Sequence, residues 1–113
     1  MLTVEKLKAW GAKVEEGLGR CLNNESFYVT LVGKAVQDPN FGKLRETVEA
    51  GDLDGAFEAA HALKGVLGNL SLTPLYESVA EITELLRSRT EMDYTPMLET
   101  ITQQQEKLEK ICE

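Results

Sequence analysis

The only histidine of the chain, His61, lies in the segment 59–70 together with Lys64, Gly65 and Gly68. A neutral imidazole has a lone pair on one ring nitrogen and can accept a phosphoryl group as a covalent intermediate. Phosphoryl transfer otherwise requires in-line positioning and stabilisation of charge. Lys64, one helical turn from His61, offers a compact cation for that purpose. The residue types and their spacing therefore predict a phosphoryl-accepting histidine with a lysine beside it.

A helix over 53–70, capped by Asp52, would position these side chains. Its apolar residues share one face that is expected to enter the core, namely Leu53, Ala56, Ala60, Leu63 and Leu67. His61 falls roughly 120° from the centre of that face, so its side chain is predicted to be exposed. Lys64 borders the apolar edge and can extend toward solvent. The alternative for Lys64 is an ordinary surface lysine, paired with Glu58 or Glu84.

Gly65 and Gly68 lie on the histidine's side of this helix. A glycine inside a helix costs about 0.5–1 kcal/mol relative to alanine, so two of them call for an explanation. There are two explanations: a partner molecule approaches the helix closely at these positions, or another helix of the same chain packs against them. We favour close approach of a partner. A surface histidine without any role remains the corresponding alternative for His61.

Turn signals divide the rest of the chain into helices, and no segment shows the alternating apolar and polar pattern of a β-strand convincingly. The expected segments are Val4–Trp10 capped by Thr3, 14–22 before Asn23, Phe27 onward to a stop at Asp38-Pro39, 41–48 closed by Gly51, 74–89 with Thr73 as cap, and a last helix opening at Tyr94-Thr95-Pro96. The expected fold is all-α: an antiparallel four-helix bundle at about 25–112 with short N-terminal helices at about 4–22, in a single domain, 1–113.

The overall composition excludes several classes of function. The net charge is −7 with no basic stripe, which argues against nucleic-acid binding. No apolar run approaches a membrane span and the first residues lack a signal-peptide pattern, so we expect a cytoplasmic protein. We also expect it to be a monomer. Cys21 and Cys112 do not form a zinc motif, and free thiols are favoured over a disulfide. Gly33-Lys34 lacks the rest of a nucleotide-binding loop, so the chain should not phosphorylate itself from ATP.

The segment around His61 resembles the phosphorylated helix of histidine-containing phosphotransfer (HPt) domains. In these domains the pattern is His-x-Leu-Lys-Gly followed by small residues, and it is met by His61, Leu63, Lys64, Gly65 and Gly68. The similarity extends to Gly17–Arg20, Phe27-Tyr28, Gly51-Asp52 and the apolar stripe of 75–86. Ser71 departs from the pattern, because many members have glycine there; this affects the turn more than the chemistry.

The resemblance implies a histidine phosphocarrier of a two-component phosphorelay, without cofactor or bound metal. His61 would exchange a phosphoryl group with an aspartate of response-regulator receiver domains, and a hybrid histidine kinase is a further implied partner. A polar residue of the next helix often supports the site in this family, and Thr83 and Arg87 are the candidates.

Two other functions are alternatives to the phosphocarrier. One is a binding module that transfers nothing and instead sequesters a receiver or inhibits a kinase. This is disfavoured because both His61 and Lys64 are present. The other is a hydrolase with His61 as general base, which lacks an evident nucleophile or metal-binding carboxylates.

Overall fold

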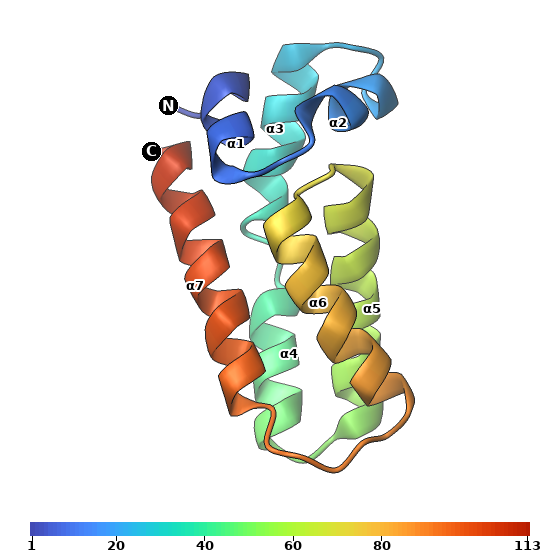
Figure 1. Ribbon diagram of the computed structural model, residues 1–113. Coiled ribbons are helices and arrows are strands. Elements are labelled where there is room, and N and C mark those ends of the chain that lie inside the picture. The colour runs from blue at the N-terminus through green and yellow to red at the C-terminus, as the bar shows by residue number, and fades with distance from the viewer.

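The computed structural model describes residues 1–113, all of which fold into helices and short connections (Figure 1). The seven helices are α1 (Val4–Trp10), α2 (Val14–Arg20), α3 (Glu25–Ala35), α4 (Asn40–Glu49), α5 (Leu53–Asn69), α6 (Thr73–Arg87) and α7 (Thr95–Cys112). The all-α prediction is confirmed. No helix combines the length and the apolar character needed to cross a membrane.

Helix α5 is the central element of the fold. It packs extensively against α4 on one side and α6 on the other, and α6 packs in turn against α7. From α4 to α7, successive helices run in opposite directions (Figure 1). Helix α3 lies above α4 and runs in the same direction, and the Asp38-Pro39 break separates the two. The helices α1 and α2 cover the same upper end, beside α3 and the α5–α6 connection.

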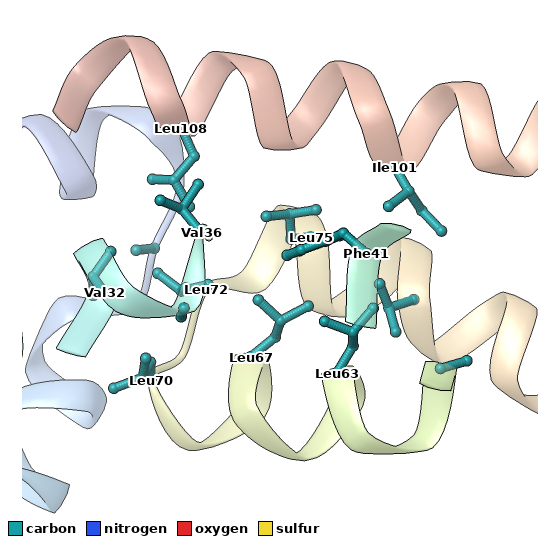
Figure 2. Close-up of a cluster of buried hydrophobic side chains, with 14 of the residues drawn as sticks. Val32, Val36, Phe41, Leu63, Leu67, Leu70, Leu72, Leu75, Ile101 and Leu108 are labelled. Carbon is teal, nitrogen blue, oxygen red and sulfur yellow. The ribbon is translucent and has the colours of Figure 1, made fainter. Parts of the chain in front are cut away.

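The core is one cluster of 25 buried apolar residues contributed by all seven helices and their connections. Leu63 and Leu67 point from α5 toward Leu75 of α6, while Ile101 and Leu108 enter from α7 (Figure 2). Leu63, Leu67 and Leu75 are fully buried, as expected for the apolar stripe of α5. Because burying each such side chain contributes roughly 1.5–3 kcal/mol, this face fixes the rotation of α5 about its axis.

Several predicted helix ends require correction. Thr73 does not cap α6: it is the first residue of that helix, and its hydroxyl donates to the Ser71 carbonyl at 3.3 Å. The segment 14–22 is shorter than expected, because Leu22 and Asn23 adopt left-handed φ angles of 57° and 56° that end α2. Asp52 caps α5 as predicted, since its carboxylate accepts from the Gly55 N–H at 2.9 Å.

The upper end of α5 is attached to the N-terminal helices by buried polar contacts. The buried Tyr28 hydroxyl of α3 donates to the Leu70 carbonyl at 2.8 Å, and burial raises the pKa of Tyr28 to about 12. A β-carbon at Gly17 of α2 would lie 2.5 Å from the Tyr28 ring, so glycine is required for this approach. The Lys13 N–H donates to the Ser71 carbonyl at 3.0 Å. These contacts hold α1 and α2 beside the end of α5.

Arg20 makes the most polar connection between α2 and α5. Its Nη1 donates to the Gly68 and Asn69 carbonyls, both at 3.1 Å, and to the Ser71 hydroxyl at 2.7 Å. The last carbonyls of a helix lack partners within the helix and carry partial negative charge. A guanidinium can satisfy several of them at once, so Arg20 caps the C-terminus of α5.

We expect Arg20→Ala to lower the free energy of unfolding by about 1–2 kcal/mol, because three acceptors lose a charged donor but can turn to water. Arg20→Lys should restore only part of this, since an ammonium cannot reproduce the planar donor geometry. Urea denaturation measures both. The matched control is Arg89→Ala, which breaks the exposed ion pair with Asp54 and should change stability by less than about 0.5 kcal/mol. Equal effects of the two alanine variants would contradict the capping role.

Candidate functional site

The site is built on the middle of α5. His61 is exposed, while Leu63, two residues later, is fully buried. The predicted orientation of His61 is therefore confirmed. The imidazole is presented to solvent by a helix whose opposite face is fixed in the core, so the histidine has a rigid support.

The imidazole ring of His61 stacks on Phe57, one helical turn earlier. The ring centroids are 5.6 Å apart and the planes differ by 20°. The Arg87 guanidinium carbon of α6 also contacts Phe57, at 5.0 Å from the ring centroid. Offset stacking and cation–π contact each favour such geometry by about 0.5–1 kcal/mol. Phe57 thus restricts the orientation of the histidine, and Arg87 acts on Phe57 rather than on the imidazole.

A cavity of about 680 Å³ opens beside His61. It is bounded by α5, α6 and α2 together with the α1–α2 connection; the lining residues are Lys13, Glu16, Arg20, His61, Lys64, Gly65, Gly68, Asn69, Ser71, Thr73, Tyr76 and Glu77. Three cations and two carboxylates line it, in a chain whose net charge is −7. The surroundings of His61 are thus more favourable to an anion than the average surface of this protein.

Lys64 lines this cavity together with His61. Its Nζ lies 3.5 Å from Oε1 of Glu84, whose other oxygen is 3.3 Å from Nε of Arg87. Of the two partners considered for Lys64, the structure selects Glu84. The pair is partly exposed and its net stabilisation is small, about 0–1 kcal/mol. An incoming phosphoryl group could therefore compete with Glu84 for Lys64 at little cost.

The two glycines of the motif have different surroundings. A β-carbon at Gly65 would meet nothing within 4 Å, and this residue is exposed. A β-carbon at Gly68 would lie 2.9 Å from Cε1 of Tyr76, whose ring from α6 covers that position. Close packing against α6, and not the approach of a partner, therefore explains the glycine at position 68, so the expectation for Gly68 was wrong. The approach of a partner remains the interpretation of Gly65.

The structure removes Thr83 from the candidates. Its side chain is fully buried, and its hydroxyl donates to the Val79 carbonyl at 2.6 Å within the same helix. The amphipathic pattern of α6 places Thr83 beside the buried Ile82, on a face that cannot contact a partner. Arg87 stays exposed and reaches the site only through Phe57 and Glu84.

Sequence reasoning missed Phe57, Lys13 and Arg20. Phe57 precedes His61 by four residues, so helical spacing alone indicated that the two rings face each other. The two cations lie about forty to fifty residues from His61 in sequence, on elements whose placement depends on tertiary packing. No local pattern could have assigned them to this cavity.

Comparison with known proteins adds one finding. The family model described as Hpt domain matches residues 37–112, which covers α4 to α7 and the whole of α5. No curated protein and no solved structure matches the chain. The match leaves out α1, α2 and α3, and with them Lys13 and Arg20.

Proposed function

The chain belongs to the Hpt domain family, and from this premise we propose that it carries phosphoryl groups on His61, exchanging them with aspartates of receiver domains. Hpt domains are histidine phosphotransfer carriers of phosphorelays that interact with receiver domains and kinases, and they are not classical enzymes. The observation that carries the proposal is the exposed His61, oriented by Phe57 and bordered by a cavity with three cations.

The transfer step has a simple balance. A lone pair of the neutral imidazole attacks the phosphorus of an aspartyl phosphate, a P–N bond forms, and the P–O bond to the receiver's carboxylate breaks. The carboxylate leaves as an anion with the bonding electron pair. The phosphorylated imidazole then loses the proton from its other ring nitrogen to solvent. The reverse sequence returns the phosphoryl group to a receiver.

Within this proposal, Lys64 stabilises charge on the phosphoryl oxygens. It lies one helical turn after His61 and lines the same cavity. A preorganised cation is most effective where charge develops in the transition state. Gly65 leaves the surface of α5 without a side chain, which gives the receiver room to bring its aspartyl phosphate in line with the imidazole. The remaining parts of the proposal are a monomeric, cytoplasmic carrier without kinase activity of its own.

Lys64→Ala is expected to slow transfer by roughly ten- to a hundredfold without abolishing it, because the lysine supplies charge and not the bond-forming atom. Rapid-quench kinetics with one phosphorylated receiver measure this rate. Glu84→Gln is the matched control: it releases Lys64 from its ion pair, and its transfer rate should equal or exceed that of the unmodified protein. If Lys64→Ala accepts the phosphoryl group as fast as the unmodified protein, Lys64 is an ordinary surface lysine with no role in transfer.

The experiment that tests the proposed function uses receivers phosphorylated with labelled phosphate and purified free of their kinases. We expect label to appear on this chain within minutes for the cognate receiver, and to be lost from that receiver at the same rate. A chain that binds the phosphorylated receiver and protects its label, without acquiring any, would be a sequestering module. That outcome would reject phosphotransfer while preserving the interaction.

A further inference from the structure

The molecule has a second cavity, of about 780 Å³, on a different surface. It lies between α4 and α7 and is closed at one end by the α6–α7 connection, and we refer to it as the α4–α7 groove. It shares no lining residue with the cavity beside His61. Helix α7 packs mainly against α6 and α1 and makes little contact with α4. A hydrogen bond of 2.5 Å from Arg45 of α4 to the Thr102 hydroxyl of α7 crosses the space between them. The bundle is therefore open along this side.

The groove has an apolar floor, because its apolar lining residues other than Met92 are buried or half-buried whereas its carboxylates are exposed. Its apolar lining comes from four elements and consists of Val48, Leu53, Met92, Tyr94 and Leu98. Met92 is an exposed large hydrophobic residue, 45% accessible, in the α6–α7 connection. Methionine is flexible and polarizable, so it can adapt its shape to an apolar partner. An apolar strip between two helices is the kind of surface that accepts the apolar face of a third helix.

The rim of the groove is acidic. Five carboxylates line it, from Glu49, Glu91, Asp93, Glu99 and Glu106, against the single cation Arg45. None of the five is in an ion pair, so Arg45 is the one cation of the groove lining that offsets their charge. Hydrogen bonds from Thr95 lower the pKa of Asp93, which keeps that carboxyl charged. The groove therefore repels anions and favours a cationic occupant.

We propose that the α4–α7 groove binds a basic amphipathic helix of a partner protein, whose apolar stripe covers the floor and whose lysines and arginines meet the rim carboxylates. A second copy of this chain does not fit this description, because its net charge of −7 would add like charges to the rim. A metal ion does not fit either, since no three acidic, histidine or cysteine side chains are grouped closely enough to hold one. Because the groove is separate from His61, a partner held there leaves the phosphotransfer surface free.

The test uses a fluorescent helical peptide of leucine and lysine, about 14 residues or roughly 21 Å long, with its leucines on one face. Anisotropy titration against the full chain should give saturable binding. The same peptide with every lysine replaced by glutamate should not bind. The variant Glu99→Gln/Glu106→Gln should weaken binding of the basic peptide roughly tenfold. The matched control Glu5→Gln/Glu25→Gln removes the same charge away from the groove and should leave the affinity within about twofold.

Amide chemical shifts locate the peptide. Those of residues 48–53 and 91–99 should move, and those of His61, Gly65 and Gly68 should not. Equal weakening by both double variants would mean nonspecific attraction to an acidic protein and would overturn the proposal. Sedimentation that shows a dimer sensitive to Glu99→Gln/Glu106→Gln would assign the groove to a second copy and would equally overturn it. Neither result bears on transfer at His61, so this proposal and the proposed function can fail separately.

Discussion

Replacing His61 with glutamine is expected to abolish phosphoryl acceptance, a loss of at least about a thousandfold, while the free energy of unfolding changes by less than about 0.5 kcal/mol. The amide keeps a polar side chain of similar reach but has no nucleophilic nitrogen lone pair. His61 is exposed, and its ring stacks on Phe57, which is itself only partly buried. The measurement pairs a transfer assay with urea denaturation.

Glu58→Gln is the control for this substitution. It places the same amide on an exposed position of α5, one residue after Phe57, and should leave both transfer and stability unchanged. Transfer at the normal rate by His61→Gln would remove His61 as the acceptor. Loss of transfer in the control would show that any new amide on this face interferes with transfer. The result for His61→Gln would then not identify His61 as the acceptor.

Gly65→Leu is expected to separate docking from folding. The helix should become more stable by about 0.5–1 kcal/mol, because leucine replaces glycine at an exposed helical position with nothing within 4 Å of its β-carbon. Transfer from a receiver should fall by two or more orders of magnitude, since the side chain occupies the surface that the receiver must approach. Phosphoramidate, a small donor without a docking surface, should still phosphorylate His61 at a near-normal rate.

The same substitution at Gly68 is expected to have the opposite effect on stability. Gly68→Leu should instead destabilise the fold by about 1–3 kcal/mol, because its side chain would displace the Tyr76 ring. Gly65→Ala should gain stability and lose little transfer. If Gly65→Leu transfers normally from receivers, the surface at Gly65 is not part of the docking site. If it also fails with phosphoramidate, the side chain disturbs His61 itself and the docking interpretation is wrong.

Local sequence signals predicted the helix that carries the site and the direction in which His61 points. Asp52 provides a cap, the leucine and alanine spacing defines one buried face, and the residues on the opposite side follow from helical geometry. The α1 helix was predicted with its observed bounds for the same reason, because Thr3 accepts from the Lys6 N–H. Both elements are specified by contacts within a few residues.

What sequence could not predict depends on contacts between distant segments. Gly65 and Gly68 have different surroundings although both belong to the motif. Only the packing of α6 on α5, which places Tyr76 over Gly68, decides which glycine is covered. Thr83 resembles a surface polar residue in sequence, yet it is fully buried, and the hydrogen bond of its hydroxyl to the Val79 carbonyl satisfies the buried donor. Lys13 joins the site because α2 is held beside the end of α5 by Arg20 and by the bond of the Lys13 N–H to the Ser71 carbonyl.

The central claim is that the phosphoryl group resides on His61, and locating that group tests it most directly. The chain is incubated with a phosphorylated receiver, separated from it, and analysed by ³¹P NMR and by tandem mass spectrometry under neutral conditions. The account predicts one phosphate per chain, bonded to nitrogen, stable in base and lost in acid, on the peptide that contains His61. A phosphate on a serine, threonine or tyrosine, or no phosphate on the chain while the receiver loses its own, would contradict it.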